Sequence, residues 1–407
     1  MEFNPAIPTI MHVDINSCFA TIEQQSNKSL RDRPLVVAAY KSSGGCILAA
    51  SLDAKKLGIK TGMRVREGLA VCKDLIVLEP DPVKYQKVHL QLRRLLYNYT
   101  PNVWPKSIDE FALDLSGCPA LKAGLCTTAR AIKGNIRRYI GDYITVSIGI
   151  GPNRFLAKTA CSLHKPDGLD EITKANFTDV YQQLALQDLH GIARNNAARL
   201  SAEGIYTVLD FYHADSQRLN RVFHSISGYY WYLRLRGWEI DSAESARKSF
   251  GNSYALPKPL YTMEELAPIL TKLVEKMCFR LHAAGFTARG VGIFVNFRDG
   301  GFWHKTSLLP EPLYESRDFF NQAYKILSQS PYKRAIKVLA VSCYSLEDAT
   351  FIQPDLFGLQ EKKFNLAKAV DSVNAKWGKF VVGPAGLLLS KTNVRDRIAF
   401  GGVRELV

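Results

Sequence analysis

Residues 10–20 read IMHVDINSCFA, and this stretch decides how the first part of the chain folds. Thr9 to Ile15 alternates and carries β-branched residues, which predicts a strand. Ser17 then opens a short helix predicted over Cys18 to Gln25. Asp14 therefore lies at the end of a strand, directly before a turn into a helix.

A pair of acids lies in a second bend. Val103–Trp104 and Phe111–Leu115 predict two short strands, with Asp109 and Glu110 between them. Strand ends far apart in sequence can lie side by side in an antiparallel sheet, so Asp14 can meet this pair. Clustered carboxylates repel unless a hard cation such as Mg²⁺ neutralises them, and two ions about 4 Å apart serve in-line nucleotidyl transfer. The alternative is a helix-capping aspartate and two solvated turn acids.

The elements around these acids follow the order strand, helix, hairpin, helix, strand. Leu121 to Ile140 predicts a long basic helix, Ile144 to Gly151 a buried strand and Arg154 to Leu163 another helix. With a small module inserted after the first helix, this order predicts a ferredoxin-like sheet in an α+β fold. A helix, turn and helix pair follows between Leu189 and Phe211, and it suits either phosphate-backbone binding or ordinary helix packing.

A second ferredoxin-like unit is predicted between Lys248 and Tyr344, from the order strand, helix, strand, strand, helix, strand. The chain carries 53 Lys and Arg against 38 Asp and Glu, a net charge of +15. Residues 245–340 hold fourteen of the basic and seven of the acidic residues. This excess indicates a polyanionic partner such as nucleic acid, although a charged surface that only confers solubility explains it equally well.

Bulk properties narrow the class of protein. A length of 407 residues suggests two to four domains. The eight cysteines are scattered without a C-x-x-C pair, which predicts neither a zinc site nor a disulfide framework. The chain starts without a signal-peptide pattern, and no apolar run approaches the roughly 18 residues of a membrane span. We therefore expect a cytoplasmic protein with no membrane partner.

The acidic motifs resemble the two palm motifs of the Y-family DNA polymerases, the DinB- and UmuC-like enzymes of lesion bypass. This similarity extends over roughly residues 8–345. It implies a template-directed DNA polymerase of translesion synthesis, with primer-template DNA and a dNTP as partners. The similar segments are IMHVDINSCFA at 10–20, GIKTGM at 58–63, SIDE at 107–110, VSIGIGPN at 146–153 and KPDG at 165–168.

The resemblance also implies a right-hand architecture with a ferredoxin-like palm, small fingers, a helical thumb and a ferredoxin-like little finger. The predicted boundaries are residues 1–26 and 86–180 for the palm, 27–85 for the fingers, 181–240 for a helix-hairpin-helix-like thumb, 241–248 for a linker, 249–346 for the little finger and 347–407 for a C-terminal extension. Leu366 to Trp377 in this extension predicts a helix, to which no role is assigned.

The family pattern assigns the acids to metals. By resemblance, Asp14 and Asp109 would bridge two Mg²⁺ ions, and Glu110 would hold the ion at the primer 3′-hydroxyl. The carbonyl of Ile15 would complete the ion on the nucleotide side.

The family pattern also assigns residues to the nucleotide. Phe19 stands at the steric-gate position, where its ring would exclude a 2′-hydroxyl; a role as a core aromatic is compatible with this. Lys165 would meet the triphosphate as a point charge. Many members carry a Tyr and an Arg where this chain has Leu52 and Lys55, so Lys55 keeps a charge without a bidentate fork. Ala193 replaces a usual glycine of the thumb hairpin, which predicts a slightly weaker hairpin.

Gln353-Pro354-Asp355-Leu356-Phe357 is similar to the peptide by which bacterial polymerases bind the sliding clamp. Leu356 and Phe357 would be the apolar anchors. The alternative is a chance match whose apolar pair packs on its own domain.

Two functions other than a polymerase are compatible with parts of this pattern. One is a non-catalytic DNA-binding accessory of the same fold, which Leu52 favours and the metal acids disfavour. The other is a nucleotide cyclase on a similar palm, which would need neither the basic second unit nor a clamp peptide. Accessory subunits are a further partner class for any of these.

Overall fold

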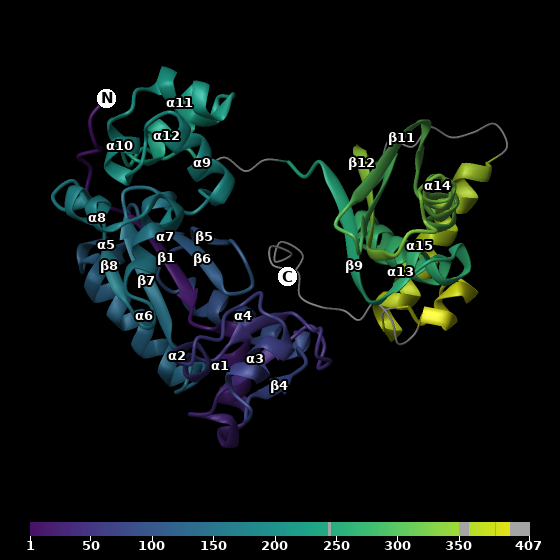
Figure 1. The fold of residues 1–407 in the computed structure, drawn as a ribbon, viewed down its shortest axis with the longest axis horizontal. Coiled ribbons are helices and arrows are strands. Elements are labelled where there is room, and N and C mark those ends of the chain that lie inside the picture. Colours follow the sequence, from purple (N-terminus) through teal and green to yellow (C-terminus); the bar gives the residue numbers. More distant parts are fainter. Residues whose placement is uncertain (243–245, 350–357, 379, 391–407) are drawn as a thin grey trace. The chain divides into compact units, whose positions relative to one another are not determined.

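The computed structural model describes residues 1–242, 246–349, 358–378 and 380–390 (Figure 1). These residues form two compact units, the first ending at residue 242 and the second starting at residue 246. The division between the units falls within residues 241–248. Within the described ranges, no helix combines the length and apolar character needed to cross a membrane.

A five-stranded sheet organises the first unit, with β1 (Ile10–Ile15) at its centre (Figure 1). The strand order is β5-β6-β1-β7-β8, and β1 runs antiparallel to both β6 and β7. The predicted ferredoxin-like order is confirmed. Strand β8 was not predicted, because its sequence LDE has no apolar pattern. The other strands are β5 (Val103–Pro105), β6 (Glu110–Asp114), β7 (Val146–Gly151) and β8 (Leu169–Glu171).

Helices cover the sheet on both faces. Met11, Val13 and Ile15 of β1 pack with α1 (Cys18–Ser26), α4 (Pro82–Leu96) and α6 (Leu125–Tyr139) in one apolar core. Because side chains alternate along a strand, His12 and Asp14 face the opposite side. Helix α7 (Arg154–Leu163) packs on that side.

The prediction of one continuous helix over Leu121 to Ile140 is wrong. Two helices, α5 (Pro119–Lys122) and α6, replace it. The chain breaks at Gly124, whose φ of 88° is accessible to glycine at little cost.

Helix α7 approaches β7 very closely at Gly149. A Cβ at this position would lie 2.0 Å from the backbone nitrogen of Cys161 and 2.1 Å from the carbonyl oxygen of Ala157. We expect Gly149→Ala to lower the free energy of unfolding by about 3 kcal/mol, because helix backbone cannot yield as a flexible side chain can. Chemical denaturation measures this. Gly134→Ala on α6, where a Cβ meets no atom within 4 Å, should leave stability unchanged or raised; equal stability of the two variants would contradict the close approach.

A small module lies between α1 and α4. Its three-stranded sheet has the order β3-β2-β4, in which β4 was not predicted. Helix α4 starts at Pro82, so the predicted boundary between residues 85 and 86 falls inside a helix. The elements are η1 (Lys28–Leu30), β2 (Leu35–Ala38), β3 (Ile47–Ala50), α2 (Leu52–Lys56), α3 (Val65–Val71) and β4 (Ile76–Leu78).

Short helices complete the first unit around an apolar cluster that contains Phe211 and Trp231. Ala193, the residue before α9, has a φ of −88°, so its backbone conformation does not require glycine; Gly191 is the residue there with positive φ. The helices are α8 (Phe177–Gln183), η2 (Leu186–Asp188), α9 (Arg194–Ala202), α10 (Val208–His213), α11 (Ser216–Phe223) and α12 (Ser227–Arg234).

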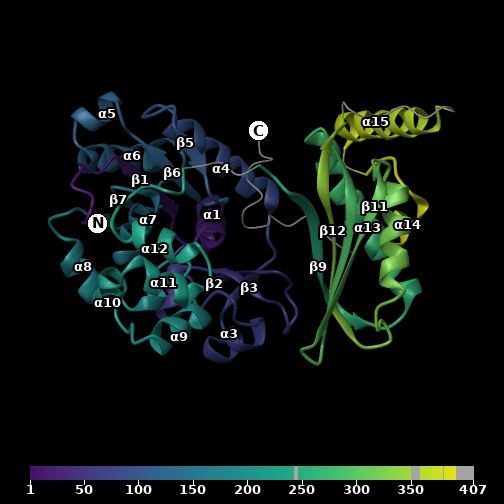
Figure 2. The same cartoon turned by 90° about the horizontal axis from the view of Figure 1, so that it is seen from above.

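The second unit confirms the predicted order of helices and strands along the chain. Its sheet does not have the strand order of the first sheet. Its strand order is β11-β10-β12-β9, with all neighbours antiparallel, so its first strand lies at an edge rather than in the centre. Helices α13 and α14 cover one face (Figure 2). The elements are β9 (Ser249–Leu260), α13 (Met263–Ala283), β10 (Phe286–Phe297), β11 (Phe302–Leu313), α14 (Ser316–Leu327) and β12 (Ile336–Asp348), followed by α15 (Leu359–Trp377) and η4 (Ala385–Ser390).

Candidate active site

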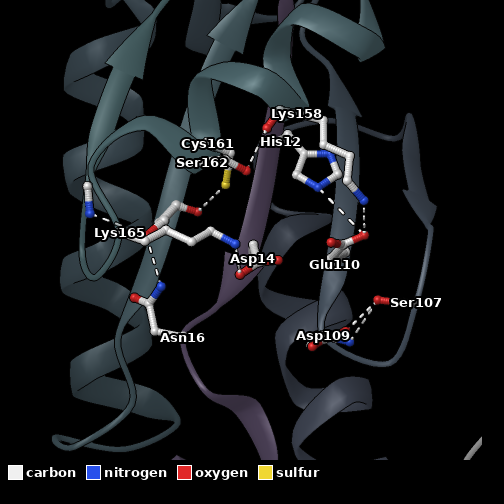
Figure 3. Close-up of polar contacts among 12 residues, drawn as sticks. His12, Asp14, Asn16, Ser107, Asp109, Glu110, Lys158, Cys161, Ser162 and Lys165 are labelled. Carbon is white, nitrogen blue, oxygen red and sulfur yellow. Dashed lines mark hydrogen bonds and ion pairs between the residues drawn. The ribbon is translucent and has the colours of Figure 1, made fainter. Parts of the chain in front are cut away.

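The register of the central sheet brings the three predicted acids together (Figure 3). Asp14, near the end of β1, lies opposite Glu110, the first residue of β6. The next residue of β1, Ile15, donates its backbone N–H to the carbonyl oxygen of Asp109 at 2.9 Å. Residues almost one hundred positions apart thus meet at one strand end.

Each acid points at a different partner (Figure 3). The ammonium nitrogen of Lys165 lies 2.7 Å from Oδ1 of Asp14, and that of Lys158 lies 2.7 Å from Oε2 of Glu110. The hydroxyl of Ser107 donates to Oδ1 of Asp109 at 2.5 Å. Two lysines and one hydroxyl therefore satisfy the carboxylates in this structure.

Burial and neighbouring charges shift the acids in opposite directions. Burial raises the pKa of Asp14 to about 7, although the nearby Lys165 opposes it. Burial also raises the pKa of Asp109, against the hydrogen bond from Ser107. Burial alone would raise the pKa of Glu110, but the neighbouring His12 and Lys158, with hydrogen bonds to this carboxylate, lower the pKa to about 2. A cation beside Asp14 and Asp109 would stabilise their charged forms.

The acids fit a hard metal by chemistry and by backbone position. In the ranges that the structure describes, no three His, Cys, Asp or Glu side chains are already gathered as a metal site. The side chains of Asp14, Asp109 and Glu110 would have to turn from Lys165, Ser107 and Lys158 to share an ion. Their oxygen donors, with the carbonyl of Ile15, are those that Mg²⁺ prefers.

A cavity of about 340 Å³ opens beside the acids. It is large enough to hold a small-molecule ligand. The cavity brings together side chains from β1, α1, α2 and the loop after α7. Most of the predicted site residues line it, namely Asp14, Ile15, Phe19, Lys55, Asp109 and Lys165, and Leu52 lines it as well, whereas Glu110 does not.

Part of the cavity lining carries positive groups that suit an anion. Lys55 and Lys165 both face it, and the pKa of Lys55 is lowered by burial and by the charge of Lys165. The N-terminus of α1 also opens onto the cavity at Ser17 and Cys18, where the helix dipole attracts negative charge. Ser17 has a φ of 51°, and its buried hydroxyl has no hydrogen-bond partner among the described residues. This combination suits a polyphosphate.

Two residues that hold the backbone of Asp167, in the loop that carries Lys165, were not predicted. The side-chain oxygen of Asn16 accepts the backbone N–H of Asp167 at 2.9 Å, and Lys133 donates to the carbonyl oxygen of Asp167 at 2.5 Å. Asn16 belongs to the motif at residues 10–20, so its proximity to Asp14 was a usable signal. Lys133 is one of several basic residues of α6, and no pattern in the sequence distinguishes it from the others. The predicted clamp peptide, Gln353–Phe357, lies outside the described residues.

Comparison with known families gives two matches. Residues 13–162 match the impB/mucB/samB family, and residues 247–356 match the impB/mucB/samB family C-terminal domain. The chain is 32% identical over 384 residues to a protein named DNA polymerase IV from Moorella thermoacetica, covering 92% of this chain and 94% of that relative. It is 28% identical over 378 residues to DNA polymerase IV 1 of Bacillus subtilis, covering 91% and 90%.

Solved structures share the fold. A Y-family DNA polymerase chimera built from Dbh and Dpo4 superposes with a TM-score of 0.73 at 22% identity, covering 84% of this chain and 99% of that chain. An insertion ternary complex of Dbh DNA polymerase gives a TM-score of 0.57 at 22% identity, covering 82% and 98%. The predicted α+β fold class of a right-hand polymerase is therefore confirmed.

Proposed function

The chain belongs to the impB/mucB/samB family, the Y-family of DNA polymerases, and we propose that it extends DNA by metal-dependent nucleotidyl transfer at Asp14, Asp109 and Glu110. It is a template-directed DNA polymerase of translesion synthesis. The observation that carries the proposed site is the pairing of Asp14 with Glu110 across β1 and β6, beside Asp109. The comparisons give no support to the rival reading as a non-catalytic accessory.

The reaction joins a primer to a nucleotide. The primer 3′-hydroxyl oxygen attacks the α-phosphorus of the dNTP, the hydroxyl proton passes to solvent, and the bond from that phosphorus to the leaving pyrophosphate breaks. When bound, two Mg²⁺ ions would make the hydroxyl more acidic and stabilise charge on the phosphate oxygens. In our proposal Asp14 and Asp109 would hold both ions, Glu110 would hold the one at the primer, and the Ile15 carbonyl would help to hold the other. The all-oxygen donor set supports this assignment.

The remaining cavity residues would bind the nucleotide. Lys165, Lys55 and the N-terminus of α1 offer positive charge to the triphosphate, and the salt bridge from Lys165 to Asp14 would open as the phosphates arrive. The side chain of Leu52 supplies no hydrogen-bond donor, so triphosphate binding would depend on the two lysines and the N-terminus of α1. Phe19, buried at the cavity wall, would exclude a ribose 2′-hydroxyl.

The partners follow from the reaction. Primer-template DNA and a dNTP are the substrates, and the basic residues of the second unit suit a DNA backbone. Accessory subunits and a cytoplasmic location, where bacterial DNA lies, belong to the same proposal. Primer extension on intact and damaged templates tests it. Extension on both in Mg²⁺ is expected, whereas no extension on either by the folded, DNA-binding protein would overturn it.

The sliding clamp is the proposed partner of Gln353, Leu356 and Phe357. Replacing both Leu356 and Phe357 by Ala is expected to eliminate stimulation of primer extension by a bacterial clamp, because the apolar anchors are lost. Basal synthesis without clamp should not change. The measurement is extension rate with and without clamp.

A matched control for the clamp experiment is Leu366→Ala, which removes an exposed leucine of α15. This variant should keep full stimulation. Undiminished stimulation of the double variant would refute the docking proposal, and equal loss in the control would show that the apolar pair has no special role.

A further inference from the structure

A second aromatic ring stands behind the proposed steric gate. Phe19 on α1 stacks on Tyr85 of α4, with ring centroids 4.4 Å apart and planes 11° from parallel. Phe19 lines the cavity, but Tyr85 does not and is 1% exposed. The gate ring therefore lies between the cavity and a buried tyrosine.

Tyr85 is itself anchored to the helix that carries Phe19. Its hydroxyl donates to Oε1 of Glu23 at 2.9 Å, and the ammonium of Lys84 lies 2.6 Å from Oε2 of the same carboxylate. Glu23 is 6% exposed, and these two donors compensate for burying its charge. Since Glu23 lies one helical turn after Phe19, the contacts form a closed loop from Phe19 through Tyr85 and Glu23 back to α1.

A steric gate selects by volume only if its wall cannot retreat. In a close-packed interior a ring supported from behind has nowhere to move, whereas space behind it lets the ring yield to an extra hydroxyl. Tyr85 fills that space behind Phe19, and its bond to Glu23 fixes the position of the tyrosine ring. The 2′-hydroxyl of a ribonucleotide would then meet a rigid surface.

We propose that Tyr85, anchored by Glu23 and Lys84, is a positioning residue that sets how strictly the polymerase rejects ribonucleotides. This inference rests on the proposed function, in which Phe19 is the gate. Tyr85 would act through Phe19 and would not touch the nucleotide.

The test is the ratio of kcat/KM for a dNTP to kcat/KM for the matching rNTP in single-nucleotide insertion. Tyr85→Leu is expected to lower this ratio about tenfold, the scale at which small changes of volume alter selection in a pocket. Tyr85→Phe keeps the ring and removes the hydrogen bond to Glu23. Glu23→Gln keeps the shape of that side chain and removes its charge. We expect both to lower the ratio by less than Tyr85→Leu.

Tyr181→Leu is the matched control. Tyr181 is a fully buried tyrosine of the first unit, and its hydroxyl donates to the carbonyl oxygen of Leu235 at 2.6 Å, in a different apolar cluster. Its replacement should lower thermal stability and leave the ratio of dNTP to rNTP insertion unchanged. A fall equal to that of Tyr85→Leu would mean that general loosening changes sugar selection, and it would overturn the inference.

Comparison with Phe19→Ala distinguishes a failure of the proposed gate from a failure of the proposed role of Tyr85. Unchanged sugar selection in Phe19→Ala would remove the gate, and the proposed role of Tyr85 would fall with it. If Phe19→Ala admits ribonucleotides while Tyr85→Leu keeps the wild-type ratio, only the role of Tyr85 is overturned. Should Tyr85→Leu fail to fold, wild-type ratios in both Tyr85→Phe and Glu23→Gln would overturn it as well.

Discussion

Asp109→Ala is expected to abolish primer extension while leaving DNA binding close to that of the unchanged protein. Asp109 lines the cavity and in our proposal would be a ligand of the metal ions, so its loss would remove that ligand. Metal ions contribute several kcal/mol of transition-state stabilisation, and about 4 kcal/mol corresponds to a loss of about a thousandfold in rate. Single-turnover primer extension measures the rate, and fluorescence anisotropy with a labelled primer-template measures binding.

Asp114→Ala, at the far end of the strand that follows Asp109, is the control. Asp114 ends β6, four residues beyond Glu110, and lies opposite Ile10 at the far end of β1. It should retain extension, because its carboxylate is remote from the cavity. Extension by Asp109→Ala at the rate of Asp114→Ala would refute the metal assignment, and a parallel loss of DNA binding would point to a folding defect instead.

Local patterns in the sequence were enough to predict the strands and turns that carry the three acids. The alternation through β1 and the turn into α1 are short-range properties, and they placed Asp14 at a strand end as the structure shows. The bend between β5 and β6 placed Asp109 and Glu110 in the same way. Their meeting needed one long-range assumption, the antiparallel pairing of β1 with β6, which the structure bears out.

Features that depend on tertiary contacts were missed. Strand β8 is held by pairing with β7 and has no apolar pattern of its own. The two units share an order of elements but differ in strand order, because the chain order does not determine which strands pair. The packing of Tyr85 behind Phe19 joins two helices and leaves no signal at either position.

The directions of the three acidic side chains could not be predicted from the sequence either. Three nearby acids suggested mutual repulsion relieved by metal, yet Lys165 and Lys158 neutralise Asp14 and Glu110 in this structure. Both lysines come from α7 or the loop after it, on the sheet face that β1 shares with α7. The same positive charges that stabilise the acids here would be available to phosphates when metals bind.

Phe19→Ala is expected to raise kcat/KM for ribonucleotides by about tenfold to a hundredfold, with a much smaller change for deoxynucleotides. The ring lines the cavity beside Asp14 and Asp109, so removing it vacates the volume that a 2′-hydroxyl would occupy. Insertion of a single dNTP and the matching rNTP on one template measures the effect.

Phe19→Ala also affects stability, because Phe19 is 2% exposed and belongs to the main core. Truncating a core phenylalanine costs about 3–5 kcal/mol, so reduced stability alone could lower all activity. Ile22→Ala, on the same helix and equally buried but not at the cavity, controls for that loss. A destabilised enzyme inserts both sugars less well, whereas an opened gate inserts ribonucleotides better in absolute terms. Unchanged ribonucleotide insertion by folded Phe19→Ala would remove Phe19 from sugar selection and leave it as a core residue only.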